Sequence, residues 1–381
     1  MDYHTLLVHA GWDRDPVTGA SSIPVYHAST FDQDDPDQPG EYDYSRSGNP
    51  TRAALEKALA ELEGGAAAFA FASGMAAVSA ALMLFQPGDH LIVGLDVYGG
   101  TFRALTRVFR RWGLTASFVD TGDPANIRAA LTPATRGIWI ETPSNPLLRI
   151  TDLAAVAELA REHGLLAIAD GTFATPFLQR PLDFGFDLVV HSATKFLNGH
   201  SDVLAGIAAA RTEELGRRVK FVQNALGAVL GVQDCWLLLR GLKTLGVRLA
   251  REQATAGWLA ERLEELPEVT RVYYPLLAGH PGREIHLRQA AGGGAVLSFE
   301  LAGGEAARAF LKRLRLPLLA VSLGGVESIM TYPVTMSHAS MPREERERRG
   351  ISDRLVRLSV GLEAGEDLLA DIKRALRPEG R

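Results

Sequence analysis

The sequence predicts an α/β protein whose large domain holds a mainly parallel sheet, followed by a smaller α+β domain at the C-terminal end. From Gly64 to Gly241, short apolar runs alternate with helical stretches, a pattern typical of parallel strands joined by helices. After Gly241 this alternation gives way to one long helical pattern and isolated strands. The chain has 381 residues, 46% of them hydrophobic, which is enough to bury the cores of two or three domains.

The N-terminal part differs from the rest in composition. Residues 1–50 are rich in Pro, Gly, Asp and Ser, and residues 32–40 read as an acidic, turn-forming loop, so we expect an extended arm. Residues 51–63 place three leucines on one helical face and end at Gly64-Gly65, as a helix does.

The central and C-terminal parts supply the remaining elements. We expect strands at 91–93, 137–140, 165–169, 187–190 and 295–301. We expect a helix at 153–163. We place a domain boundary near residue 246, which gives an α/β domain at 51–245 and an α+β domain at 246–381.

Charge and cysteine content restrict the partners and the compartment. Forty basic and forty-five acidic residues leave a net charge of −5, which favours neither a nucleic acid nor an anionic membrane as partner. Residues 64–85 are uncharged and long enough to span a bilayer, but their small residues and the break at Ser73-Gly74 favour a buried strand followed by a buried helix. Cys235 is the single cysteine and no secretory signal is visible, so we expect a cytoplasmic protein.

Several other patterns do not indicate a site. The ten histidines show no metal-ligand spacing, so no metal is expected. Residues 292–294 are glycines that precede a strand and lack the dinucleotide spacing, which argues against a nicotinamide cofactor. Residues 343–349 interleave Arg with Glu, the pattern of a solvated helix face. We expect His191 and Cys235 to be packed side chains.

Polar side chains follow the predicted strands where these strands end. Asn145, Asp170 and Lys195 each come shortly after an apolar run, and ligands of parallel sheets bind at the carboxyl ends of the strands. A desolvated lysine has a lowered pKa and forms Schiff bases with aldehydes. Ser192 and Thr194 carry hydroxyls suited to a phosphate, and Asp170 can hold a pyridine nitrogen protonated.

Two further segments fit the same ligand. Ser73-Gly74-Met75 stands before an Ala-rich helix, and a helix N-terminus with a glycine attracts anions. On its own this signal is weaker than ordinary helix capping, and it gains weight from the Lys195 cluster. Tyr98 follows another predicted strand, where its ring can stack on a planar cofactor or pack in the core.

With these residues in place, the chain resembles the Cys/Met-metabolism (trans-sulfuration) family of fold-type I pyridoxal 5′-phosphate (PLP) enzymes. The strongest matches are DGTFATP at 170–176 and HSATKFLNGHSD at 191–202. Further matches in the family's order are YSRSGNPT at 44–51, SGM at 73–75, ETPSNP at 141–146, SLGG at 322–325 and RLSVG at 357–361. The resemblance covers nearly the whole chain.

The resemblance implies a fold-type I PLP-dependent transferase-like subunit that assembles as a homotetramer with active sites between subunits. It implies that Tyr44 and Arg46, in the arm, reach the phosphate of the neighbouring subunit's PLP. It implies these roles within the subunit: phosphate binding by Gly74, Met75, Ser192 and Thr194, ring stacking and assistance in proton transfer by Tyr98, pairing with the pyridinium by Asp170, the Schiff base and general base by Lys195, and substrate carboxylate binding by Asn145, Ser322 and Arg357.

The chain also departs from the family pattern. Gly171 stands where relatives commonly have Asn, and Gly100 stands where methionine γ-lyases carry Cys. Val321 stands where many cystathionine γ-lyases and γ-synthases carry Glu. Residues 226–236 and 336–339 look most like bacterial cystathionine β-lyases of the γ-lyase-like type.

The resemblance thus implies a PLP-dependent carbon–sulfur lyase of methionine biosynthesis and cysteine metabolism that acts on a small sulfur amino acid. We expect β-elimination of L-cystathionine to homocysteine, pyruvate and ammonia. Cystathionine γ-lyase, cystathionine γ-synthase and methionine γ-lyase activities stay open on the same scaffold. An alternative of another class is a PLP-binding sensor without turnover.

Overall fold

The computed structural model of the protein describes residues 1–11, 14–339 and 341–377. Its larger sheet has seven strands in the order β1-β7-β6-β5-β4-β2-β3. Their bounds are β1 (Ala67–Phe71), β2 (His90–Gly94), β3 (Thr115–Val119), β4 (Thr135–Glu141), β5 (Leu166–Asp170), β6 (Leu188–Ser192) and β7 (Gly206–Ala210). Strand β7 runs antiparallel to both of its neighbours, and all other neighbouring pairs are parallel. The predicted mainly parallel sheet is therefore confirmed.

Helices cover both faces of this sheet, which is why its strands are apolar throughout. Val189 on β6 packs in a cluster with α2 (Pro50–Glu63) and α6 (Leu153–His163). Val190, the next residue, points to the other face and packs with α3 (Gly74–Leu82) and α8 (Glu213–Leu226). The loops at the strand ends thus extend from a rigid, doubly covered sheet.

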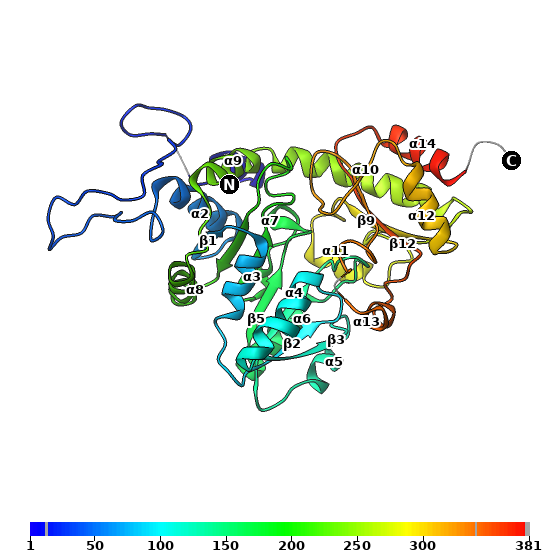
Figure 1. Cartoon of the computed structure of the whole chain (residues 1–381), viewed down its shortest axis with the longest axis horizontal. Helices are drawn as coiled ribbons and strands as arrows, with labels where there is room; N and C mark the ends of the chain where they lie inside the picture. Colours follow the sequence, from blue (N-terminus) through cyan, green and yellow to red (C-terminus); the bar gives the residue numbers. More distant parts are fainter. Residues whose placement is uncertain (12–13, 340, 378–381) are drawn as a thin grey trace.

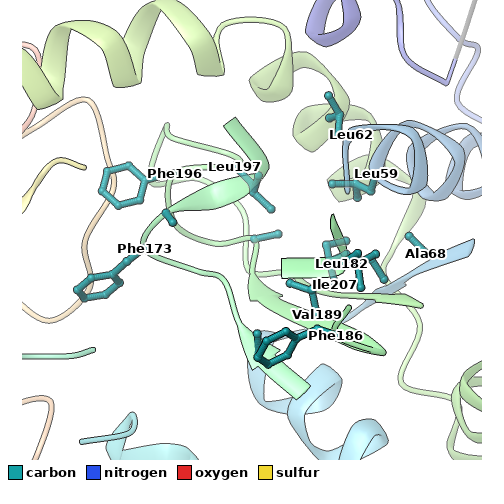
Figure 2. Packing of buried hydrophobic residues seen from close by; sticks show 14 of the residues in the cluster. Leu59, Leu62, Ala68, Phe173, Leu182, Phe186, Val189, Phe196, Leu197 and Ile207 are labelled. Carbon is teal, nitrogen blue, oxygen red and sulfur yellow. The ribbon is translucent and has the colours of Figure 1, made fainter. Parts of the chain in front are cut away.

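Figure 2 shows part of the first cluster, in which Leu59 and Leu62 of α2 lie near Val189 and Ile207 of the sheet. The helix predicted at 51–63 is confirmed, and its leucines are buried as expected. The charge-free stretch at 64–85 forms the buried strand β1 and helix α3. Among the described residues, no helix is long and apolar enough to cross a bilayer.

One region of the larger domain does not follow the predicted alternation. After β2 the chain forms α4 (Gly99–Arg103), which continues as a π-helical turn, η1 (Ala104–Val108), and a 3-10 turn, η2 (Phe109–Trp112). Further short elements are α5 (Pro124–Ala129), α7 (Thr175–Leu178), η3 (Pro181–Phe184) and α9 (Val232–Leu242).

The second sheet has five strands in the order β10-β11-β12-β9-β8 and is mostly antiparallel. Its strands are β8 (Val269–Tyr273), β9 (Val296–Leu301), β10 (Leu318–Leu319), β11 (Ile329–Thr331) and β12 (Leu355–Ser359), and the helices of this region are α10 (Leu245–Glu264), α11 (Arg283–Gln289), α12 (Gly304–Arg313), α13 (Arg343–Arg348) and α14 (Gly365–Leu376). Helix α10 runs along the top of the view in Figure 1, from the larger sheet to the smaller one. The α+β character expected here is confirmed, while the boundary at residue 246 stays a prediction.

The N-terminal region begins with a short helix, α1 (Tyr3–His9), which the turn-rich composition did not predict. The Tyr3 hydroxyl donates a hydrogen bond to the carbonyl oxygen of Leu62, 2.9 Å away, and so attaches α1 to α2. Residues 14–49 contain no helix or extended strand, and Figure 1 shows much of this segment reaching away from the body of the subunit.

Candidate active site

The loops at the carboxyl ends of the parallel strands bring Lys195 next to polar side chains of the smaller domain. Lys195 follows β6, and its Nζ donates a hydrogen bond to Ser322 Oγ at 2.6 Å. Phe196 and Leu197, the next two residues, are both buried and anchor the turn, and Figure 2 shows their side chains pointing to different sides of it. Burial, together with the positive charge of Arg357, lowers the pKa of Lys195 to about 8. The amine is thus far easier to deprotonate than a surface lysine.

Arg357 lies on β12 of the smaller sheet and joins that sheet to the larger one. Its Nη1 donates to Asn145 Oδ1 at 2.8 Å, and its Nη2 donates to the carbonyl oxygen of Ser322 at 2.7 Å and to Thr331 Oγ1 at 3.0 Å. Burial lowers the pKa of Arg357 to about 10, and nearby Glu141 opposes this shift. Within the described chain, the buried Nε has no hydrogen-bond partner, so a donor is available to an anionic ligand.

Asp170 is the last residue of β5, next to β6. Its Oδ1 accepts hydrogen bonds from the backbone N–H and the hydroxyl of Thr172, at 3.0 and 2.5 Å. Burial raises the pKa of Asp170, and these two hydrogen bonds oppose that change. The described residues make no hydrogen bond to Oδ2, which leaves this oxygen able to accept from a ring N–H.

The start of α3 lies against the end of β6. Ser73 caps the helix by accepting the N–H of Ala76 at 3.1 Å. A Cβ on Gly74 would lie 2.8 Å from the Cβ of Ser192, so Gly74 permits the close approach of these two predicted phosphate ligands. Thr194 Oγ1 donates to the carbonyl oxygen of Ala205 at 3.2 Å, which ties this hydroxyl to the backbone.

Tyr98 stands between β2 and α4 and is 40% exposed. Its backbone N–H donates to Glu141 Oε2 at 2.9 Å. A Cβ on Gly100 would lie 2.4 Å from Cε1 of Tyr98 and 2.7 Å from the sulfur of Met75, so the absent side chain makes room for both predicted cofactor contacts.

Tyr44 and Arg46 do not join these residues within the same subunit. Arg46 Nη1 donates to the backbone carbonyl of Asn224 at 2.8 Å, and its guanidinium lies 5.5 Å from the centroid of the Tyr44 ring. The Tyr44 side chain is exposed. Their predicted role toward a neighbouring subunit stays a prediction.

Sequence reasoning missed one group that shapes the site, Glu141, and it correctly expected another, His191, to be a packed side chain. Glu141 is a polar residue at a strand end, the same signal that identified Asp170, yet its role as acceptor for Tyr98 needed the fold. His191 is buried and lies 2.5 Å from Glu63 Oε1 through its Nε2, which confirms it as a hydrogen-bonded packing residue. A Cβ on Gly171 would lie 2.6 Å from Cε1 of this ring, so the His191 ring lies close against the position where a side chain would begin.

One sequence prediction is wrong at a single residue. The segment 343–349 was expected to be a solvated helix face, and α13 has no buried residue, but Arg349 directly after it is 0% exposed. Its guanidinium packs 5.0 Å from the ring centroid of Phe102 and 5.3 Å from that of Phe118. Its Nη2 also donates to Glu345 Oε2 at 3.1 Å, as an exposed helix residue would. The Arg–Glu pattern could not distinguish Arg349 from its exposed neighbours because the two rings that bury it lie far away in the sequence.

The arrangement defines a class of protein: an α/β enzyme with a desolvated lysine, an opposing carboxylate, an anion-binding helix start and a buried arginine at one sheet edge. These residues fit PLP, since the amine can bond its aldehyde, Asp170 can pair with its ring nitrogen, and the start of α3 can receive its phosphate. Among the described residues, no group of three or more His, Cys, Asp or Glu is placed to hold a metal ion.

Comparison with known proteins identifies the family. The family described as Cys/Met metabolism PLP-dependent enzyme matches residues 4–377, and the chain belongs to it. The chain is 58% identical to cystathionine beta-lyase MetC of Bacillus subtilis, with 98% of this chain and 96% of the relative covered. It is 50% identical to cystathionine gamma-lyase of the same organism, with 99% of each chain covered.

A solved structure agrees over the whole fold. Cystathionine gamma-lyase from Lactobacillus plantarum, complexed with L-serine, superposes with a TM-score of 0.96 at 48% identity and covers 98% of each chain. The predicted fold-type I architecture, the PLP cofactor and the class of enzyme, a PLP-dependent carbon–sulfur lyase resembling cystathionine β-lyases, are confirmed at this level.

Proposed function

We propose that this protein cleaves L-cystathionine by β-elimination and releases homocysteine, pyruvate and ammonia. The observation that carries the proposal is the placement of Lys195 Nζ 2.6 Å from Ser322 Oγ, beside the buried guanidinium of Arg357. This places a base of lowered pKa next to a site for an amino-acid carboxylate. The similarity to a cystathionine beta-lyase at 58% identity supports the choice of reaction.

PLP, when bound, supplies the aldehyde that captures the substrate amine and an electron sink for the electrons left at Cα after deprotonation. Asp170 keeps the ring nitrogen protonated, because its Oδ2 can accept that N–H while Thr172 holds Oδ1. This carboxylate therefore sets the strength of the electron sink.

Lys195 acts as the general base. An amine with a pKa of about 8 is neutral in about one tenth of molecules at pH 7, far more than a surface lysine, so it can remove the α-proton and return a proton later. Ser322 orients the amine by accepting its hydrogen bond. Tyr98, at the mouth of the site, can assist transfer of a proton to the leaving sulfur.

Asn145, Ser322 and Arg357 hold the substrate carboxylate. Arg357 is already fixed by hydrogen bonds to Asn145, Ser322 and Thr331, so little side-chain freedom is lost when substrate binds. Its Nε, which is unpartnered among the described residues, supplies a donor in a site of low dielectric, where a charge-assisted bond is strong.

The γ-reactions are the second candidate on the same scaffold, because one lysine can abstract both protons that they require. Relatives with cystathionine gamma-lyase and gamma-synthase names are 50% and 48% identical. Val321 favours β-elimination: it is 61% exposed beside Ser322, so this position next to the site is apolar where many γ-enzymes carry a carboxylate. A sensor without turnover is disfavoured because both the base and the carboxylate for the ring nitrogen are present.

Product identification tests the proposal directly. The cofactor-loaded protein is incubated in turn with cystathionine, methionine, homocysteine and O-acylhomoserines, and products are identified by mass. Pyruvate and homocysteine from cystathionine are expected. 2-Oxobutyrate from cystathionine would indicate γ-elimination, cystathionine formed from an O-acylhomoserine and cysteine would indicate the synthase, and a yellow protein inert toward all substrates would indicate a sensor.

We also propose a homotetramer with shared active sites in the cytoplasm. Much of the segment 14–49 reaches away from the body of its own subunit in Figure 1, and the Tyr44 side chain is exposed, which suits this segment for a neighbouring site. The single cysteine, Cys235, is buried, so the subunit needs no disulfide and suits a reducing compartment.

A further inference from the structure

The chain between β11 and β12 crosses the site, and we call its residues 332–339 and 341–350 the strap. Arg349 attaches the strap to the larger domain: its Nη1 donates to the carbonyl oxygen of Leu95, and its guanidinium lies close to the rings of Phe102 and Phe118. A fully buried guanidinium is costly unless it is paired. Arg349 is paired with Glu345 of α13, at 3.1 Å from Nη2, and with a backbone oxygen of the loop that leads to Tyr98.

A second contact fixes the end of the strap. Arg149 Nη2 donates to the backbone carbonyl of Arg349 at 2.7 Å, and its Nη1 donates to Asp120 Oδ2 at 3.2 Å. Arg149 Nε also lies 4.0 Å from Asp96 Oδ2, and that oxygen accepts the hydroxyl of Ser144 at 2.6 Å. The strap is thus tied to the loop after β2 and to the loop after β4, which carry Tyr98 and Asn145.

The middle of the strap lies on the site itself. A Cβ on Gly99 would lie 2.7 Å from the carbonyl oxygen of Ser337, so the strap rests directly on the residue after Tyr98. The next strap residue, His338, is buried. Burial and the charge of Arg357 lower the pKa of His338 to about 3, which keeps the imidazole neutral near the predicted carboxylate site.

We propose that Arg349 is a positioning residue for the amino-acid substrate, which holds the strap closed over Tyr98 and the Arg357 site. This inference rests on the proposed function, since it assumes that Arg357 binds the substrate carboxylate. In the described part of the chain Arg349 makes no hydrogen bond to Lys195 or Asp170. Loss of its guanidinium therefore weakens substrate binding and leaves proton transfer at Lys195 largely intact.

Arg349→Met tests this in the cofactor-loaded protein, with Arg348→Met as the matched control. Arg348 is the adjacent residue and is 60% exposed. It pairs with Glu345, the carboxylate that Arg349 also contacts, but it reaches neither Leu95 nor the two phenylalanine rings. We expect Arg349→Met to raise KM about tenfold while kcat changes less than about twofold, with unchanged visible absorbance of the cofactor. Arg349→Lys should give a smaller rise in KM, because an ammonium can bond Leu95 but cannot stack as a planar group. Arg348→Met should match the unmodified protein.

Hydrogen exchange supplies a readout that does not depend on turnover. Peptides from 341–350 should exchange faster in Arg349→Met than in Arg348→Met, measured without substrate. Equal KM and equal exchange in the two variants would overturn the inference, as would a loss of kcat and of cofactor absorbance in Arg349→Met and Arg349→Lys alike. If the unmodified protein turned over no sulfur amino acid, the proposed function would fail, whereas the exchange difference would still report whether Arg349 holds the strap.

Discussion

Burial decides which of the site's side chains are chemically active. Lys195 lies at the edge of a covered sheet beside Arg357, and burial together with this positive charge lowers its pKa to about 8. Glu141 is buried and Asp170 is partly buried at neighbouring strand ends, and desolvation raises both of their pKa values. These residues are ordinary by type, and their environment makes them a base, a ring partner and a backbone acceptor.

Lys195→Ala tests the base. Because the same amine bonds the cofactor and moves the proton, we expect release of pyruvate to fall by at least about a thousandfold, with loss of the visible absorbance of the bound cofactor. Lys57→Ala is the control, since Lys57 is exposed on α2 and only approaches Glu61 at 3.9 Å. Turnover by Lys195→Ala comparable to that of Lys57→Ala would exclude the assigned role.

The lowered pKa of Lys195 predicts a pH dependence for cofactor uptake. Only the neutral amine attacks an aldehyde, and its fraction grows about tenfold per pH unit below the pKa. The rate constant for PLP binding to cofactor-free protein should therefore rise with pH and level off above about 8. Stopped-flow absorbance measures this, and a rise continuing to pH 10 would show that the amine is not desolvated.

Strand β7 lies in close backbone contact with the start of α3, the predicted phosphate site. Gly206, the first residue of β7, lies so near the start of α3 that a Cβ there would come 2.0 Å from the carbonyl oxygen of Ser73 and 2.9 Å from Cα of Gly74. The glycine is needed for this approach. The position of the α3 N-terminus is thus set by the antiparallel strand β7, which the sequence pattern did not identify.

Gly206→Ala should therefore displace the start of α3. We expect PLP to bind at least about tenfold more weakly, and the free energy of unfolding to fall by about 1–3 kcal/mol, as for an overpacked core. Gly303→Ala is the control, because a Cβ there meets no atom within 4 Å and its φ of −171° is extended. Cofactor titration and thermal unfolding measure both effects, and equal behaviour of the two variants would contradict the assignment.

The assembly determines whether the site is complete. Tyr44 and Arg46 lie outside the cluster around Lys195 in their own subunit, and the arm that carries them extends from the body in Figure 1. In the proposed tetramer each site combines the lysine of one subunit with the arm of another. A subunit that lacks the lysine and a subunit that lacks the arm residue can therefore form a complete site together.

Mixing of variants tests the shared site. Lys195→Ala and Arg46→Ala should each be nearly inactive alone. After subunit exchange at equal amounts, about one quarter of the sites carry both native residues, so about one quarter of the native activity should return. Activity that stays at the level of the separate variants would show that the arm serves its own subunit, or that no exchange occurred, which mass spectrometry of the intact oligomer checks.

The sequence alone determined the features that depend on local pattern. Apolar runs and helix periodicity predicted the parallel sheet and the helices at 51–63 and 153–163, because burial on both faces imposes that pattern. The position of polar residues at strand ends, with family motifs, identified Lys195, Asp170 and Arg357 as candidates.

The tertiary structure decided what depends on residues distant in the chain. It paired Arg349 with Leu95, Tyr98 with Glu141 and His191 with Glu63, and it placed Gly206 against Ser73. A charge pattern indicates which side chains are neighbours along one helix. Whether a side chain is buried, and which distant residue it pairs with, depends on contacts between separate elements. For this reason Arg349 had the local pattern of a solvated residue, and only the fold showed that it is buried.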